Sequence, residues 1–300
     1  MSKDTGRDHM HTALDCIPCF VKQALESARF VTNGAAVHEQ VVRQALRSTS
    51  ELNFRQSPPA FAQELHRQLR SITGVDDPYR PAKDRFNQLA LKMLPELAAR
   101  VADADDPLNM ALRVAIGGNA IDLGANPGMT EAEAREAVIG ATDEPVQGNV
   151  TDFRNTIAAS ADILYLTDNA GEIVLDRLLI EHLPLERVTV AVRGGPVLND
   201  ATMIDAEAAG LRDLVDVIDN GSDAPGTILS DCSENFRSRY AAADIVIAKG
   251  QGNFETLSDE PRPTYFLFKV KCPLIGNYAG YPTGAHVVMR EHEMPPRRQD

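Results

Sequence analysis

Four short motifs in the second half of the chain combine glycine with aspartate, asparagine or lysine. They are DNAGE at 168–172, RGGPVLNDAT at 193–202, DNGSDAPGT at 219–227 and KGQGNFE at 249–255. Carboxylate and amide oxygens are the ligands that a hard cation such as Mg²⁺ or Mn²⁺ prefers. Glycines at helix starts let backbone N–H groups approach an oxyanion, where the helix dipole adds to the attraction. These residue types therefore predict a site for a divalent cation and a phosphate group.

Each of the four motifs follows a short apolar run rich in Ile, Val and Leu, as is typical of strands buried on both faces of a parallel sheet. The predicted strands are 161–167, 187–192, 214–218, 243–248, 265–268 and 273–275. Helical segments alternate with them, which predicts an α/β fold built on a doubly wound, mostly parallel α/β/α sheet. Because ligands bind beyond the carboxyl ends of parallel strands, we expect the four motifs to meet at one edge of this sheet.

The first third of the chain has the apolar spacing of amphipathic helices and no convincing strand. Apolar stripes begin at Ile17 and recur over 37–46, 61–72 and 86–101. Gly74 is expected to end the third helix, and Asp106-Pro107 to begin a fifth that ends at Gly117-Gly118. The predicted organisation is an N-terminal all-helical region at 1–117, an α/β metal- and phosphate-binding domain at 118–292 and a tail at 293–300.

Composition narrows the possible partners. The net charge of −13 and the lack of a basic run argue against a nucleic-acid partner. No run of about 18 apolar residues predicts a membrane span, and the polar first residues do not resemble a secretory signal. Four cysteines are too few for a disulfide scaffold in a chain of 300 residues, so we expect reduced thiols and a cytoplasmic location. The sequence shows no coiled-coil heptad pattern, so it does not predict an oligomeric state.

A structural interpretation of the polar motifs competes with the functional one. Asp, Asn and Gly are also the ordinary residues of strand–helix loops and helix N-caps. Asp200 could cap the helix that follows it, and Asp168 taken alone is more often a cap than a ligand. The coincidence of such residues after several strands is what favours a functional site.

The pair Cys16 and Cys19 could bind zinc or cycle as a redox pair. Structural zinc needs four ligands, and a thioredoxin-like pair needs a preceding strand that is not predicted here. A structural role at the start of the first helix is therefore favoured. KGQGNFE has Glu255 where a dinucleotide fingerprint has its third glycine, and the chain has no P-loop motif.

The ordered set of motifs resembles the damage-control phosphatase family, also known as domain of unknown function 89 or the acidic-residue-methyltransferase-like metal-binding family. The matching pieces also include CIPC at 16–19 and GNAID at 118–122, so the resemblance extends from Asp15 to about Asn277. The paired cysteines are similar to those of the prokaryotic-type subfamily. The resemblance implies a helical N-terminal region on a doubly wound α/β/α domain.

The resemblance also implies roles for individual residues. A divalent cation (Mg, Mn, Co or Ni) would be held by Asp168, Asn169 and Asp200. Lys249 would bind phosphate, and Asn119 and Asp122 would close the pocket from the helical region. The full set expected to bind substrate or phosphate is Asn119, Asp122, Gly171, Glu172, Lys249 and Asn253.

The activity implied by the resemblance is metal-dependent hydrolysis of a small phosphomonoester, such as a sugar phosphate or a damaged phospho-metabolite. Asp168 and Lys249 would be the catalytic residues, with Asp168 acting as a ligand only or also as nucleophile or base. Two alternatives stay open: an S-adenosylmethionine-dependent carboxyl methyltransferase and a non-enzymatic metabolite-binding module.

Overall fold

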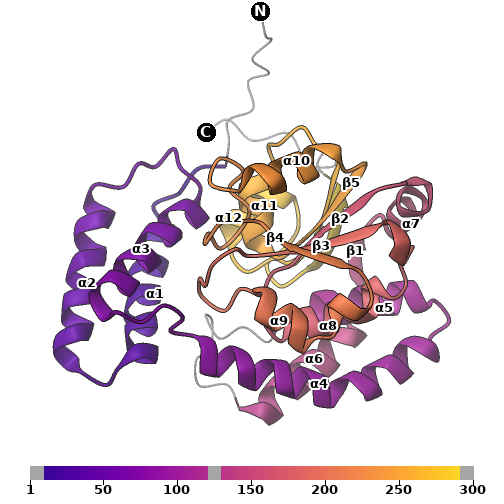
Figure 1. The fold of residues 1–300 in the computed structure, drawn as a ribbon, viewed down its shortest axis with the longest axis horizontal. Helices are drawn as coiled ribbons and strands as arrows, with labels where there is room; N and C mark the ends of the chain where they lie inside the picture. Colours follow the sequence, from indigo (N-terminus) through magenta and orange to yellow (C-terminus); the bar gives the residue numbers. More distant parts are fainter. Residues whose placement is uncertain (1–9, 121–129, 291–300) are drawn as a thin grey trace, which may run out of the picture.

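The apolar runs of the second half form one seven-stranded sheet in the computed structural model, which describes residues 10–120 and 130–290. Its strands are β1 (Val146–Gly148), β2 (Ile163–Leu166), β3 (Val188–Val192), β4 (Asp216–Asp219), β5 (Ile245–Lys249), β6 (Thr264–Lys269) and β7 (His286–Arg290). The strand order is β1-β7-β6-β5-β2-β3-β4 (Figure 1). All neighbouring strands are parallel except β6 and β7. The predicted fold class is therefore confirmed.

The order of the strands reverses at β2. From β2 the chain moves to β3 and β4 on one side, and then returns to β5 and β6 on the other side of β2. In register, Leu164 of β2 pairs with Thr189 of β3 and with Val246 of β5. Such a switch point separates the loops that leave the two neighbouring strands, and so leaves a crevice at their carboxyl ends.

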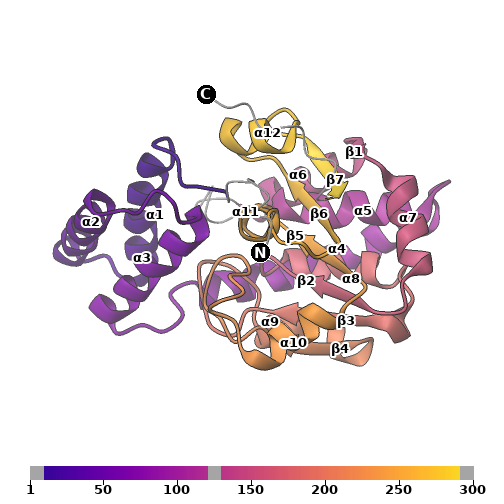
Figure 2. The same ribbon diagram turned by 90° about the horizontal axis from the view of Figure 1, so that it is seen from above.

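Helices cover both faces of the sheet (Figures 1 and 2). Alternate residues of β2 point to opposite faces, so Ile163 and Tyr165 belong to one core and Leu164 and Leu166 to the other. The helices of the first face are α4 (Arg80–Ala102), α5 (Pro107–Gly117), α6 (Glu131–Asp143), α7 (Val150–Ala159), α8 (Glu172–Ile180) and α9 (Met203–Ala208). Those of the second face are α10 (Glu234–Ala242), α11 (Gln251–Leu257) and α12 (Pro273–Ala279).

Three further helices form a unit beside this layered part: α1 (Cys16–Val31), α2 (Ala35–Ser50) and α3 (Pro58–Thr73). Figure 1 shows them at one end of the molecule. They enclose a core of their own, centred on Phe20, Phe61 and Leu65. Gly74 ends α3 in the left-handed conformation, with φ 68°, as predicted.

The helices predicted for the first third are confirmed, and the way they pack is informative. Asp106 caps α5 by accepting a hydrogen bond from the backbone N–H of Asn109 at 3.2 Å. Both α4 and α5 contribute apolar residues to the core beneath the sheet rather than to the core of α1–α3. The residue ranges given for the domains stay a prediction.

Two details of the sequence-based prediction are wrong. The run 273–275, predicted as a strand, is the start of helix α12, because Pro273 occupies the first helical turn behind an extended Cys272. A three-residue apolar run cannot separate a strand from a buried helix by its pattern alone. The short edge strand β1 and the antiparallel β7 were not predicted.

Within the described ranges, no helix is both long and apolar enough to cross a membrane.

Candidate functional site

The three expected cation ligands lie together at the carboxyl ends of β2 and β3. Asp168 and Asn169 follow β2, and Asp200 lies in the loop after β3. Backbone hydrogen bonds join the two segments: Ala201 N–H donates to the Asp168 carbonyl at 2.7 Å, and Ala170 N–H donates to the Asn199 carbonyl at 2.8 Å. Asn169 and Asp200 consequently face each other as a single antiparallel bridge. All three side chains are buried.

Two asparagine amides connect the carboxylates of Asp168 and Glu172. Asn119 Nδ2 donates to Asp168 Oδ2 at 3.0 Å and to Glu172 Oε2 at 2.8 Å. Asn169 Nδ2 donates to the same two oxygens at 2.8 and 3.1 Å. Because ionised carboxylates only accept, both amides must turn their NH₂ groups toward them and their carbonyl oxygens away. Among the described residues, the Oδ1 atom of Asn119 is buried without a hydrogen-bond partner, which is unusual for a buried acceptor.

Asp200 does not act as a helix cap. Helix α9 begins after Thr202, whose side chain forms a capping box with Asp205. Helix α8 is preceded by Gly171, so Asp168 does not cap it either. The alternative interpretation of these two aspartates as caps is therefore wrong.

Gly171 and Gly250 have positive φ angles of 79° and 80° where their loops pass close to the site. The N–H of Gly171 donates to Asn87 Oδ1 of α4 at 2.7 Å. Asn87 in turn donates to Asp205 Oδ1 at 2.8 Å, so α4 supports the loop after β2. Asn87 had no signal in the sequence, since it looks like any polar residue of an amphipathic helix. The phosphate-binding role expected of Gly171 stays a prediction.

Lys249 lies at the end of β5 and is fully buried. Its ammonium donates to the Ala115 carbonyl at 2.9 Å, to Glu172 Oε1 at 2.8 Å and to Asp176 Oδ1. Burial lowers the pKa of Lys249, but Asp176 and Glu172 raise it by more, so the group stays charged with a pKa above its ordinary value. All three N–H donors have protein acceptors, and the expected binding of phosphate by Lys249 stays a prediction.

Arg193, at the carboxyl end of β3, is a buried residue of the site that the sequence analysis did not single out. Its Nε donates to Asp200 Oδ2 at 2.7 Å, and its Nη2 lies 3.9 Å from Asp168 Oδ1. Its Nη1 donates to Thr227 Oγ1 and Asn253 Oδ1, both at 3.3 Å. Its position directly after a strand was the signal that could have identified it.

Asn253 and Asp176 support this arrangement from α11 and α8. Asn253 Nδ2 donates to the Lys249 carbonyl at 2.7 Å and to the Thr167 carbonyl at 3.1 Å, which joins the ends of β5 and β2. The role in phosphate binding expected of Asn253 stays a prediction. Asp176 was missed, although its spacing of four residues from Glu172 places both carboxylates on one face of α8. Asp122 lies outside the described residues.

The buried charges of the site do not balance. Among the described residues it contains four buried carboxyl groups (Asp168, Glu172, Asp176 and Asp200) and two buried cations (Arg193 and Lys249), so the carboxyl groups outnumber the buried cations by two. Lys271 also acts electrostatically on Asp168 and Asp200. The pKa of Asp168 is well above its ordinary value because of burial and the nearby Glu172 and Asp200. Burial also raises the pKa of Asp200, although Arg193 acts in the opposite direction. Burial raises the pKa of Asp176 to about 7 despite the attraction of Lys249.

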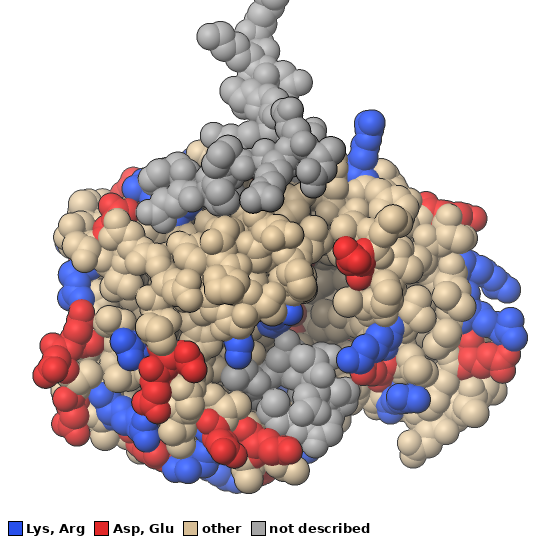
Figure 3. All heavy atoms as spheres, turned by 180° about the vertical axis from the view of Figure 1, so that it is seen from behind, with Lys and Arg blue, Asp and Glu red and all other residues tan. Residues whose placement is uncertain are grey.

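The three-helix unit is attached to the loops that surround the site. Gln63, Arg67 and Arg70 form a stripe along α3 and hydrogen-bond Asp223 in the loop after β4. Arg70 Nη1 also donates to the Pro196 carbonyl at 2.8 Å, in the loop that leads to Asp200. The helical unit thus holds two site loops at once. Figure 3 shows the molecular surface hollowed between this unit and the layered part.

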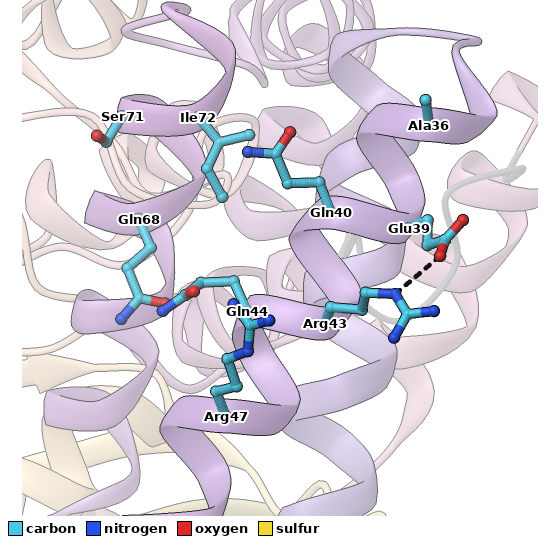
Figure 4. A pocket seen from close by; sticks show the side chains of 9 residues that line it. All are labelled: Ala36, Glu39, Gln40, Arg43, Gln44, Arg47, Gln68, Ser71 and Ile72. Carbon is cyan, nitrogen blue, oxygen red and sulfur yellow. Dashed lines mark hydrogen bonds and ion pairs between the residues drawn. The ribbon is translucent and has the colours of Figure 1, made fainter.

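A depression of 530 Å³ lies elsewhere, on the outer surface between α2 and α3 (Figure 4). Its walls are long polar side chains such as Gln40, Arg47 and Gln68. It contains none of the strand-end residues, so it is separate from the candidate site.

At the start of α1, Cys16 packs against the α1–α3 core and Cys19 is exposed, and the role of this pair stays a prediction.

The fold and these contacts define the class of protein: a doubly wound α/β protein whose strand ends gather carboxyl groups, amides, an arginine and a lysine around a buried site. The comparisons with known proteins are specific. The model of the damage-control phosphatase ARMT1-like domain matches residues 12–287. The chain belongs to this family. The family and the phosphatase function expected from the sequence are therefore confirmed.

Two relatives and one solved structure match over most of their length. A damage-control phosphatase of Archaeoglobus fulgidus is 34% identical over 90% of this chain and 95% of its own length. An uncharacterized protein of Methanocaldococcus jannaschii is 30% identical over 92% of this chain and 94% of its own. The crystal structure of a DUF89 family protein from Pyrococcus horikoshii has a TM-score of 0.84 at 30% identity, covering 94% of this chain and 100% of that one.

Proposed function

We propose that this protein is a metal-dependent phosphatase that hydrolyses small phosphomonoesters, with a divalent cation held by Asp168, Asn169 and Asp200. The observation that carries the proposal is that buried carboxyl groups outnumber buried cations by two around these oxygen ligands. Buried charges are costly unless they are paired or coordinate a metal. One divalent cation would neutralise the excess. When bound, the cation would polarise a phosphoryl oxygen and stabilise the charge that develops on it.

The chain's own residues would prepare the site in two ways. The NH₂ groups of Asn119 and Asn169 hold Asp168 and Glu172 and leave the amide oxygens facing away from these carboxylates. This supports Asn169 as an oxygen ligand, and the unpaired Oδ1 of Asn119 as an acceptor for a substrate hydroxyl group or a metal-bound ligand. Glu172, Gly171 and Asn253 would contribute mainly by fixing these loops.

Lys249 and Asp168 are the proposed catalytic residues. To bind a phosphoryl oxygen, the Lys249 ammonium would exchange one of its present acceptors for that oxygen, and Glu172 at 2.8 Å is the acceptor nearest to the proposed ligands. Asp168 would bind the cation and could also attack phosphorus. Mass spectrometry of protein quenched in acid during turnover separates these roles, because only an attacking carboxylate, having displaced the alcohol, carries the phosphoryl group as an acyl phosphate until water releases it.

The substrates we propose are small phosphorylated metabolites, including sugar phosphates. Relatives from Archaeoglobus fulgidus and Pyrococcus horikoshii are both named damage-control phosphatases, and these names support damaged phospho-metabolites as a further class. The four cysteines are free thiols, which supports the cytoplasm as the proposed location.

The proposal is tested by phosphate release from p-nitrophenyl phosphate and a panel of sugar phosphates with Mg²⁺, Mn²⁺, Co²⁺ or Ni²⁺. We expect release that a chelator abolishes and that Asp168→Asn lowers by at least about 100-fold, since the negative charge and one oxygen of a cation ligand are lost. Asp213→Asn, the same change at an exposed position, is the matched control. Folded wild-type protein that releases no phosphate with any of the metals contradicts the proposal. Chelator-insensitive methyl transfer from S-adenosylmethionine to a carboxylate would favour the methyltransferase instead.

A further inference from the structure

Arg193 is placed between the two carboxylates that are proposed to bind the cation. Its Nε donates to Asp200 Oδ2 at 2.7 Å, while its Nη2 lies 3.9 Å from Asp168 Oδ1. Arg193 forms ion pairs with both of these carboxylates, and Lys271 also acts on both electrostatically. Asp168 follows β2 and Asp200 follows β3, so Arg193 connects the ends of two neighbouring strands.

The other side of the guanidinium is held by the protein. Nη1 donates to Thr227 in the loop after β4 and to Asn253 of α11. Thr227 Oγ1 donates to Asn253 Oδ1 at 2.8 Å, and Asn253 is itself bonded to the backbone of β2 and β5. The planar group is therefore fixed on its outer side, and its direction toward Asp168 and Asp200 is determined.

One donor of this group is unused. Nη2 is buried and has no hydrogen-bond partner in the part of the chain that the structure describes. A buried, unsatisfied donor on a charged group is destabilising, so its acceptor is expected to come from a ligand or a small movement. Asp168 Oδ1 needs to approach Nη2 by only about 1 Å to form a hydrogen bond of ordinary length.

We propose that Arg193 is a positioning residue of the cation site: Nε holds Asp200 and Nη2 holds Asp168, so that both carboxylates present oxygens to one divalent cation. This inference rests on the proposed function. Lys249 does not take this role, because its three donors are directed at Ala115, Glu172 and Asp176. Lys83, which is also buried, is directed at Asp77 and Asp205. The fork of an arginine can hold two carboxylates at a set spacing, whereas a lysine is a point charge.

The test is the affinity of the cation-free protein for Mn²⁺, measured from the electron paramagnetic resonance signal of free Mn²⁺. Arg193→Lys keeps the charge and removes the fork. We expect it to weaken Mn²⁺ binding by about 10–100-fold, the effect typical of losing a group that orients metal ligands. Arg187→Lys, the same change at the exposed amino end of β3, should leave the affinity unchanged. The thermal midpoints of the cation-free variants show whether each variant is folded, so that weaker Mn²⁺ binding is not confused with a loss of folding. The kcat of Arg193→Lys should partly recover toward the wild-type value at saturating Mn²⁺.

The outcomes separate this inference from the proposed function. Wild-type affinity for Mn²⁺ in folded Arg193→Lys overturns the inference alone. Wild-type protein that binds no divalent cation overturns the inference and the proposed function together. Should Arg193→Lys not fold, Thr227→Val removes one acceptor of Nη1 and leaves the charge and both carboxylates in place. We expect Thr227→Val to weaken Mn²⁺ binding by less than the about 10–100-fold expected for Arg193→Lys. An unchanged affinity for Mn²⁺ in folded Thr227→Val overturns the inference.

Discussion

Gly250 lies against the carboxylate of Asp168 so closely that no side chain fits between them. A Cβ atom at position 250 would lie 2.0 Å from Asp168 Oδ2 and 2.2 Å from its Cγ. Non-bonded atoms cannot approach so closely, and the φ of 80° at Gly250 is unfavourable for any L-residue. The loop after β5 can therefore pass the end of β2 only with glycine at this position.

Gly250→Ala should consequently displace Asp168 and lower phosphatase activity by at least about 100-fold, because a misplacement of about 1 Å at a catalytic group has an effect of this size. Gly74→Ala is a matched control, since Gly74 also has a positive φ (68°) but has nothing within 4 Å of a new Cβ atom. The control should lose only about 1–2 kcal/mol of stability from backbone strain. Activity and urea unfolding of both variants check this. Full activity in folded Gly250→Ala would show that Asp168 is not needed in its present position.

Lys249→Met should lower the free energy of unfolding by about 3–5 kcal/mol, because it leaves Glu172 and Asp176 buried without their cation. Adding Asp176→Leu should recover part of this loss, since one of the two uncompensated charges is removed. Urea unfolding of the wild type, the two single variants and the double variant measures the coupling. If Lys249 serves only to bind phosphate, Lys249→Met will lose activity while its stability stays close to that of the wild type.

The stability of the cation-free protein should depend on pH through Asp176. Its pKa rises from the ordinary 3.8 to about 7 on folding. At pH values between these two, the native state therefore binds more protons than the unfolded state. Stability is then greatest below about pH 4 for this group and is lost as the pH rises toward 7. Thermal midpoints between pH 4 and 8 should show this decline in the presence of a chelator.

Asp176→Asn, which resembles the protonated form, is expected to flatten this decline. Mn²⁺ should raise the thermal midpoint more at pH 7.5 than at pH 5, because protons compete with the cation for the carboxyl groups of Asp168 and Asp200, whose pKa is raised in the cation-free fold. A Mn²⁺ effect that is larger at pH 5 would contradict the charge balance described for the site.

Asp223→Asn should loosen the three-helix unit from the loops around the site. Burial raises the pKa of Asp223, but hydrogen bonds from Arg67, Gln63 and Arg70 lower it by more, to about 2. A depressed pKa stabilises the fold above the unfolded value of about 3.8, and this stabilisation is lost as the pH falls toward 2. At pH 7 the variant should lose about 1.5–3 kcal/mol, the usual value of hydrogen bonds to a charged group.

The difference between Asp223→Asn and the wild type should shrink between pH 4 and 2, which urea unfolding at several pH values measures. Because Arg70 also holds the loop of Pro196, we expect KM for the phosphomonoester to rise in this variant while Asp213→Asn has no effect. An equal loss of stability at pH 7 and pH 2 would show that the charge of Asp223 does not hold the helices.

Much of the fold could be read from local patterns. The strands β2, β3 and β5 follow from near-continuous apolar runs, because strands buried on both faces need apolar side chains at nearly every position. The end of α3 at Gly74 follows from the left-handed conformation that only glycine adopts at low cost. The prediction failed for two short elements. The strand Val146–Gly148 is too short to show a period, and the helix Pro273–Ala279 begins with apolar residues that resemble a strand.

The sequence by itself determined which polar residues stand at the ends of strands, and therefore that Asp168, Asn169 and Asp200 share one edge of a parallel sheet. Only the tertiary structure decided what each side chain touches. It turned Lys249 toward Glu172 and Asp176, placed Arg193 between the two aspartates, and brought Asn87 and Asn119 to the site from helices far away in the chain. The physical reason is that strand and helix patterns depend on neighbours along the chain, whereas hydrogen bonds and buried charges depend on which distant segments packing brings together.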